Sequence, residues 1–176
     1  GLAQYANGDL EAADQSLTSF LAKMREAGDT LTAIGITFTL ANLRMARGHL
    51  HDAVRTYQQA LQLAASQGEP MPAGTADLYR GISELYCERG DLDAAEQHLL
   101  AGKKLGEQAV LTGWQHRLRV AEARLKEAQG DLEGTLNLLD EAERWARENG
   151  LPRFHVHVVN DGGRKLAMQR GHELVR

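Results

Sequence analysis

Apolar residues recur along this chain at the spacing of amphipathic helices. Leu92, Ala95, Leu99 and Gly102, for example, fall on one face of a helix, with charged and amide residues between them. The same pattern predicts helices over residues 9–27, 30–47, 50–67, 75–89, 92–109, 113–129 and 132–149. The phase of the pattern predicts an eighth helix over 152–169, against the local preference of a β-branched run at 155–159.

Glycine turns divide these helices into repeating pairs. One set of turn glycines is spaced by 40, 42, 40 and 41 residues and comprises Gly8, Gly48, Gly90, Gly130 and Gly171. A second set ends the partner helices in three of the repeats and comprises Gly28, Gly68 and Gly150. Glycine suits a helix end because it adopts the left-handed conformation without steric cost. We therefore expect units of about 40 residues, each a pair of antiparallel helices.

Short polar residues near these turns are candidates for helix N-caps, because their side-chain oxygens accept a backbone N–H of the first helical turn. The candidates are Asp9, Asp29, Thr75, Asp91, Thr112 and Asp131. Turns, caps and apolar stripes together predict an all-α fold, a right-handed superhelical solenoid of antiparallel helix pairs. We expect it to form a single repeat array over residues 1–176.

Composition and charge narrow the functional classes. Of the 176 residues, 43% are hydrophobic and 25% are charged, which fits a globular protein with a packed core. The formal net charge of −4 argues against a nucleic-acid surface, and no run of about 18 apolar residues is present to span a membrane. The single cysteine, Cys87, fits a reducing compartment, so we expect a cytoplasmic protein.

The repeat resembles the tetratricopeptide signature. An alanine stands five residues after three of the turn glycines, at Ala13, Ala53 and Ala95. Tyr57 stands at the large apolar position, nine residues after the turn glycine Gly48. Thr135 departs from the small position of the signature. The period of about 40 residues also exceeds the usual 34.

The units RGDLDAAEQHLLAG and QGDLEGTLNLLDEAERWARENG are similar to the helical sensor region of large ATP-dependent LuxR-type transcription regulators, the family of the maltose regulon activator. This resemblance covers essentially the whole chain. It implies a region that binds an inducer or a regulatory protein and controls self-association. In that family the region lies between an N-terminal nucleotide-binding module and a C-terminal helix-turn-helix that reads DNA.

The chain itself shows neither flanking module. It contains no G-x-x-x-x-G-K-[ST] loop and no basic recognition helix, so we expect no cofactor and no direct contact with nucleic acid. It begins at Gly1 without a methionine, and we interpret it as a piece of a longer protein. Exposed repeat ends then favour self-association.

The first helix of each tetratricopeptide pair lines a concave groove, which is the usual binding face of helical repeats. Counting back from the turn glycines predicts these groove residues: Asn42, Asp77, Arg80, Glu84, Arg117, Arg124 and Lys165. Three arginines and a lysine on one face are suited to hold an anionic group. The alternative is that they are surface residues of amphipathic helices, paired at i, i+4 as Arg80 and Glu84 can be.

Other candidate sites have less support. A carboxylate clamp for peptide ends is not expected, because Phe38 and Gly81 stand where it needs polar partners beside Asn42. We expect no metal, because histidines at i and i+2 of a helix point apart. The histidines concerned are His49, His51, His155, His157 and His172. Cys87 has no histidine near it in sequence, so it is not expected to act as a nucleophile.

Two functions remain open. The first is a sensor or protein-interaction domain of a transcription regulator, with a small-molecule effector or a partner protein in the groove. The second is a general adaptor that recognises a peptide in a pathway other than transcription. An enzyme is not expected, because no residue pattern in the chain motivates catalysis.

Overall fold

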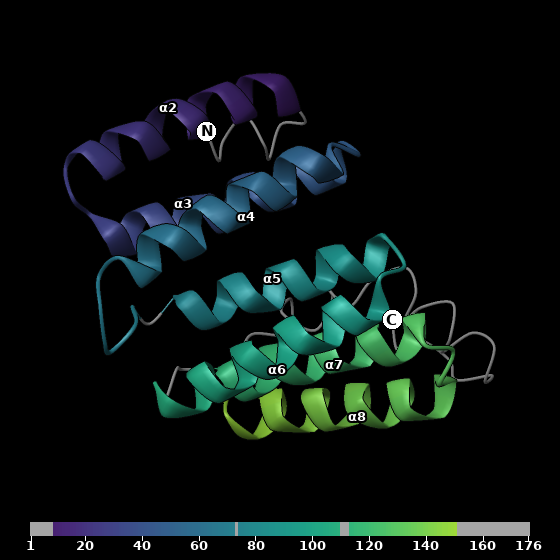
Figure 1. The fold of residues 1–176 in the computed structure, drawn as a ribbon. Helices are drawn as coiled ribbons and strands as arrows, with labels where there is room; N and C mark the ends of the chain where they lie inside the picture. The colour runs from purple at the N-terminus through teal and green to yellow at the C-terminus, as the bar shows by residue number, and fades with distance from the viewer. Residues whose placement is uncertain (1–8, 73, 110–112, 151–176) are drawn as a thin grey trace. The chain divides into compact units, whose positions relative to one another are not determined.

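The computed structural model describes residues 9–72, 74–109 and 113–150, and within these ranges the regular structure consists of seven α-helices (Figure 1). The helices are α2 (Leu10–Glu26), α3 (Thr30–Ala46), α4 (Leu50–Ala65), α5 (Thr75–Glu88), α6 (Leu92–Gln108), α7 (Trp114–Ala128) and α8 (Leu132–Glu148). Each agrees with a predicted range to within two residues at either end. The predicted eighth helix and the turn at Gly171 lie outside the described residues.

Glycine turns end the helices as predicted. The backbone φ angle is +76° at Gly48 and Gly90 and +81° at Gly130, which places all three in the left-handed region. At Gly48 and Gly90 the backbone N–H groups of the turn donate to carbonyl oxygens of the preceding helical turn. These bonds satisfy carbonyls that the helix end leaves without partners.

All four predicted aspartate caps are confirmed. Asp9, Asp29, Asp91 and Asp131 accept hydrogen bonds from backbone N–H groups three residues further on, at 2.8–3.2 Å. The two threonine caps are wrong. The N-cap of α5 is Gly74, so Thr75 is already the first helical residue, and the N-cap of α7 is Gly113 rather than Thr112.

The chain divides into two compact units, residues 1–109 and 110–176. In the first unit, α2 to α6 pack in sequence order, each helix against the next. In the second unit, α7 packs against α8. Antiparallel pairing in an all-α fold is therefore confirmed, while the superhelical hand and the single array remain predictions.

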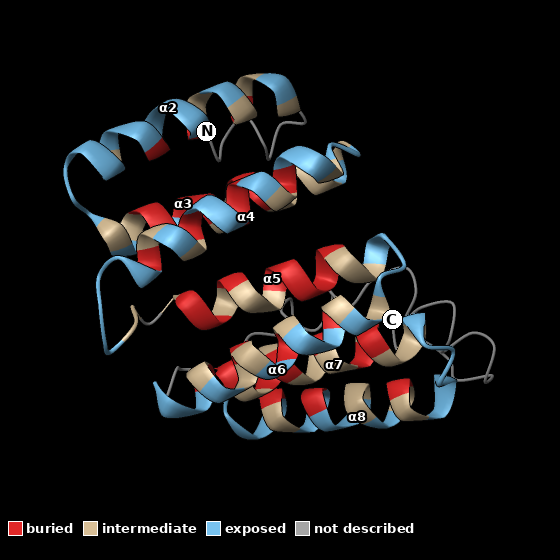
Figure 2. Cartoon of the chain, in the orientation of Figure 1, coloured by how far each residue is buried: buried red, intermediate tan, exposed pale blue. Residues whose placement is uncertain are grey.

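Small and branched apolar residues form the core of the first unit (Figure 2). The alanines five residues after the turn glycines, Ala13, Ala53 and Ala95, are fully buried and allow adjacent helices to approach closely. Tyr57, at the large position of the repeat, is also fully buried. None of the helices in the described ranges is long and apolar enough to cross a membrane.

Candidate functional site

The groove residues predicted on α5 come together as one ion-pair cluster. Arg80 Nε lies 3.1 Å from Asp77 Oδ1, and Arg80 Nη1 lies 2.5 Å from Glu84 Oε1. The side chains of Arg80 and Glu84 are 11% and 10% exposed, and that of Asp77 is 26% exposed. Their spacing of three and four residues brings them onto one face of the helix. The i, i+4 pairing of Arg80 with Glu84 is therefore observed, but both side chains are mostly buried and not on the surface.

Aromatic and amide side chains from α3 and α4 surround this cluster. The guanidinium carbon of Arg80 lies 4.8 Å from the centre of the Phe38 ring, and the Phe38 and Tyr57 rings meet edge to face. Tyr57 Oη donates a hydrogen bond of 3.2 Å to Asn42 Oδ1. Asn42 thus helps to satisfy a buried phenol, and Phe38 provides a face on which a cation is stabilised.

Burial and charge determine the protonation states in the cluster. Burial, the largest influence on Arg80, lowers its pKa, but the carboxylates of Glu84 and Asp77 outweigh it and raise the pKa above its ordinary value. Burial also raises the pKa of Tyr57 well above its ordinary value. Tyr57 therefore stays neutral near pH 7, while Arg80 stays charged.

The charge balance of the cluster is unfavourable for anion binding. Arg80 carries one positive charge and contacts two carboxylates, those of Asp77 and Glu84, so the three side chains together are negative at neutral pH. An incoming anion would have to displace one of these carboxylates from a mostly buried guanidinium. Arg80 is thus part of a structural ion-pair network on one face of α5.

The other predicted groove cations do not lie on α5 with Arg80. Arg117 and Arg124 lie on α7 in the second unit, where both are partly buried. The guanidinium carbon of Arg117 lies 5.9 Å from the centre of the buried Trp114 ring. Lys165 lies outside the described residues, so the predicted set of four cations on one face stays a prediction.

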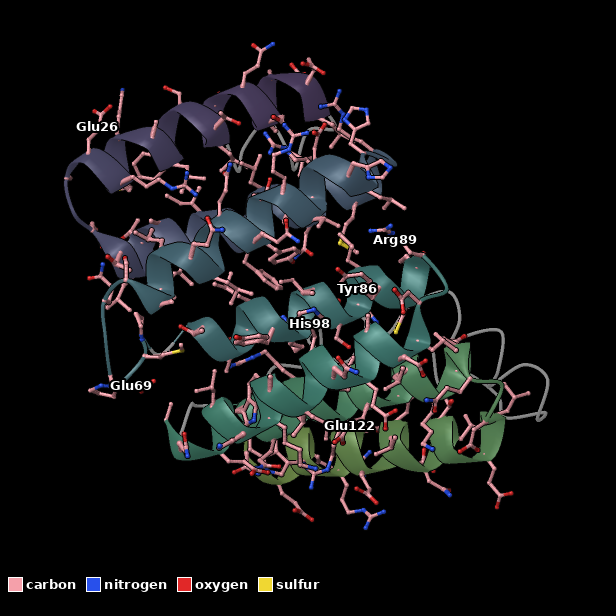
Figure 3. The ribbon with its side chains drawn as sticks, viewed as in Figure 1. Glu26, Glu69, Tyr86, Arg89, His98 and Glu122 are labelled. Carbon is pink, nitrogen blue, oxygen red and sulfur yellow. The ribbon has the colours of Figure 1, made fainter. Side chains whose placement is uncertain are left out.

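An aromatic stack between α5 and α6 was not predicted from the sequence. The Tyr86 ring stacks on the His98 ring with 5.3 Å between ring centres (Figure 3). The guanidinium carbon of Arg89 lies 5.6 Å from the centre of the Tyr86 ring. The centre of the Tyr79 ring lies 6.0 Å from the centre of the same imidazole ring. Burial lowers the pKa of His98, which keeps the imidazole neutral near pH 7 and suits it to packing between tyrosines.

A second network that the sequence did not reveal joins the first three described helices. Arg44 of α3 donates from Nε and Nη2 to the two carboxylate oxygens of Asp14 on α2, each at 3.0 Å. Its Nη1 donates to Thr56 Oγ1 on α4 at 2.6 Å. A bidentate guanidinium–carboxylate pair fixes relative orientation as well as distance. This clamp therefore holds the repeat that carries Asn42 and Tyr57.

Candidate metal ligands do not assemble in the part of the chain that the structure describes. Within residues 9–72, 74–109 and 113–150, no three His, Cys, Asp or Glu side chains are grouped to hold a metal ion. His155, His157 and His172 lie outside these ranges. Cys87 is a half-buried thiol on α5.

Comparison with known proteins supports the repeat class. A family model described as the MalT-like TPR region matches residues 1–172. The crystal structure of BtubC (BKLC) from P. vanneervenii is similar with a TM-score of 0.66 at 19% identity, over 92% of this chain and 66% of that one. A tetratricopeptide repeat protein from Parabacteroides merdae ATCC 43184 aligns over 97% of this chain and 71% of that one at 18% identity, with a TM-score of 0.36. No curated protein matches the sequence.

The similarity to BtubC supports a shared fold only, because the sequence identity of 19% is below 25%. This chain also spans less than two thirds of the length of BtubC. The match of the family model over nearly the whole chain agrees with the glycine turns, the buried alanines and the antiparallel helix pairs described above.

Proposed function

This chain belongs to the family of MalT-like TPR regions, and on that premise we propose that it is the sensor and protein-interaction region of a transcription regulator. The match over residues 1–172 is the observation that carries the proposal. A repeat region of this type implies a protein-interaction domain, since helical repeats present long faces to their partners. In the proposed role it binds an effector or a partner protein on the first helices of its pairs.

The described groove residues refine where that contact is made. Asp77, Arg80 and Glu84 are committed to one another, so their role is to hold the face of α5 in shape. Arg117 and Arg124 on α7 are partly exposed and carry positive charge, which suits contact with carboxylate or phosphate groups. We propose Arg117 and Arg124, each of which already interacts within the chain, as candidates for contact with an anionic effector group.

The experiment measures transcription from a reporter gene controlled by the full-length protein that contains this chain. Arg117→Gln and Arg124→Gln keep a polar side chain and remove the charge. We expect each to raise the effector concentration for half-maximal response about tenfold, the loss of one charge-assisted contact. Arg80 is not a suitable target, because its replacement removes two mostly buried ion pairs and would reduce stability.

Arg55→Gln on α4 is the matched control, because Arg55 is 69% exposed and lies on the second helix of its pair. Its response should equal that of the unmodified protein. Full response in the Arg117→Gln and Arg124→Gln variants would rule out the proposed effector contact on α7.

A further inference from the structure

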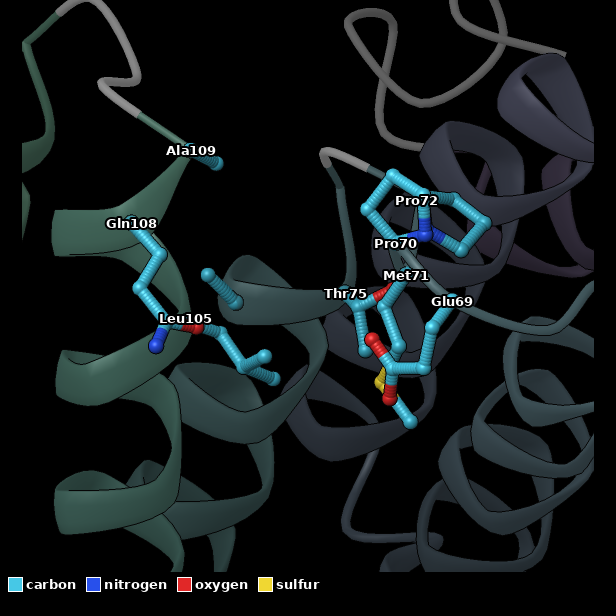
Figure 4. Close-up of a pocket in the computed structure, with 9 residues that line it drawn as sticks. Glu69, Pro70, Met71, Pro72, Thr75, Leu105, Gln108 and Ala109 are labelled. Atoms are coloured by element: carbon cyan, nitrogen blue, oxygen red, sulfur yellow. The ribbon is translucent and has the colours of Figure 1, made fainter.

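The two ends of the α5–α6 pair in the first unit are packed differently. At the end formed by the start of α5 and the last turn of α6, a cavity of about 110 Å³ is lined by Thr75 and Leu105, among others (Figure 4). Packing between the two helices is therefore incomplete there. Toward the other end, Tyr86 in the last turn of α5 stacks on His98 of α6 (Figure 3). The aromatic stack is thus a main contact of this pair.

The imidazole of His98 contacts two tyrosine rings of α5. Its plane is 5° from that of Tyr86, with 5.3 Å between ring centres, and 30° from that of Tyr79, with 6.0 Å between ring centres. Tyr79 and Tyr86 are seven residues apart, so they lie two turns apart on one face of the helix. One side chain of α6 therefore bridges two turns of α5.

Close backbone packing fixes the position of Tyr79. Gly102 lies one turn after His98 on α6, and a Cβ there would stand 3.1 Å from Tyr79 Cβ and 3.1 Å from Ala76 O. The α6 backbone thus lies directly against α5 at this point. The helices have no slack with which to enlarge the space around the imidazole.

Neighbours on α6 give the imidazole no charged partner. Side chains three and four residues away on a helix are the ones that share a face. Around His98 these positions hold only small uncharged residues, namely Ala94, Ala95, Ala101 and Gly102. A proton added to the imidazole would find no carboxylate on its own helix face.

The neighbours on α5 do not supply a carboxylate either. The charged group beside the stack is the cation Arg89, whose guanidinium carbon lies 5.6 Å from the Tyr86 ring centre. The Arg80 cluster, with both its carboxylates, faces Phe38 of α3 instead. Among the described residues, the groups that face His98 from α5 are therefore two tyrosines and, beyond one of them, a cation.

This setting opposes protonation of His98. Burial lowers the pKa of the imidazole, so the neutral ring is the form that the folded chain favours. The face of a tyrosine ring attracts a cation, but the Tyr86 ring already interacts with Arg89, and two cations at one ring repel each other. A proton on His98 would therefore weaken the stack.

From this geometry we infer that His98 is a pH-responsive contact between α5 and α6, which holds the two helices together when neutral and loosens them when mild acid protonates it. The device needs no effector and does not depend on the proposed function. It makes the packing of this repeat sensitive to pH in the range in which histidine titrates.

The first test is an NMR titration of the imidazole in the whole chain from pH 8 to pH 4.5. His98 should titrate below the ordinary histidine value of about 6.5, and its contact with the Tyr86 ring should weaken as it is protonated. Tyr86→Ala removes one covering ring, so the midpoint should move back toward the ordinary value. A midpoint at or above 6.5 in the unmodified chain, or no movement in Tyr86→Ala, would overturn the inference.

The second test compares the unmodified chain with His98→Phe by urea denaturation at pH 7.5 and pH 5. Phenylalanine keeps an aromatic ring that cannot be protonated. A group whose pKa is lowered on folding stabilises the fold fully above its unfolded pKa and loses that contribution as the pH falls. The folded-to-unfolded ratio of the unmodified chain should therefore fall relative to that of the variant. The fall is at most about thirtyfold, the limit for an imidazole that stays neutral when folded.

Amide hydrogen exchange, corrected for its intrinsic pH dependence, locates the effect. Exchange in α5 and α6 should rise from pH 7.5 to pH 5 in the unmodified chain and not in His98→Phe. His51→Gln is the control, because His51 is exposed on α4, and its profile should follow that of the unmodified chain. Parallel pH profiles of the unmodified chain and His98→Phe, or loss of the response in His51→Gln, would contradict the assignment to His98.

Discussion

The hydroxyl of Tyr57 lies so close to the backbone of Gly81 that a Cβ at position 81 would stand 2.2 Å from the phenol oxygen. Tyr57 is fully buried, and its hydroxyl is held by Asn42, so it has little freedom to move away. This contact sets how closely α4 approaches α5. Glycine at position 81 is therefore a packing requirement between adjacent repeats rather than a turn signal.

Gly81→Ala should destabilise the chain through this contact. Overpacking in a closed core costs about 1–3 kcal/mol, which exceeds the helix propensity that alanine adds. The free energy of unfolding from urea denaturation, followed by circular dichroism, measures the effect.

Gly35→Ala is the matched control, since Gly35 lies within α3 and a Cβ there meets nothing within 4 Å. It should raise stability by about 0.5–1 kcal/mol, because alanine is the better helix former. If the two variants shift stability alike, the Tyr57–Gly81 contact does not constrain the repeats as described.

Arg80→Met should be strongly destabilising. It keeps much of the aliphatic stem but removes the ion pairs that Arg80 makes with the mostly buried Glu84 and with Asp77. Breaking a buried ion pair on one side costs about 3–5 kcal/mol. The midpoint of thermal unfolding, together with the urea denaturation curve, checks this expectation.

The control for this variant is Arg55→Met in the exposed pair with Asp52, whose side chains are 69% and 51% exposed. Exposed pairs contribute about 0–1 kcal/mol, so little change is expected. An Arg80→Met protein as stable as Arg55→Met would show that the cluster on α5 is not a structural network.

The stability of the first unit should depend on pH through Asp14. The hydrogen bonds from Arg44 hold the pKa of this carboxyl below its ordinary value. A group whose folded-state pKa is depressed stabilises the fold fully above its unfolded pKa of about 3.9 and loses that contribution as the pH falls through the folded value. The difference in stability between the unmodified chain and Asp14→Asn should therefore be constant from about pH 5 to 7.

Below about pH 4 that difference should shrink. Thermal unfolding of the two proteins from pH 2 to pH 7 measures it. A difference that persists unchanged at pH 2 would mean that the Arg44–Asp14 pair contributes through shape alone.

Local features of this fold were predictable because they depend on neighbours in sequence. Gly48 and Gly90 take the positive φ that ends a helix, and Asp91 caps the next helix through a backbone bond three residues away. The pairing of Arg80 with Glu84 is likewise local, at i and i+4. Such signals need no knowledge of which helices pack together.

The errors and omissions arise from contacts between helices. Thr75 was expected to cap α5, but Ile34 of α3 leaves no room for a side chain at Gly74, so the N-cap position falls on glycine. The contact of Phe38 with Arg80 depends on the approach of α3 to α5. The cavity beside Thr75 depends on the approach of the loop to α6. The spacing of residues within one segment does not determine any of these distances between helices.

The most direct test of the proposed role is the sequence of the gene on both sides of the region that encodes these 176 residues. A sensor region of a MalT-like regulator predicts a phosphate-binding loop, G-x-x-x-x-G-K-[ST], upstream and a helix-turn-helix with a basic recognition helix downstream in the same reading frame. A reading frame that contains neither would contradict the regulator proposal and favour a general peptide-binding adaptor.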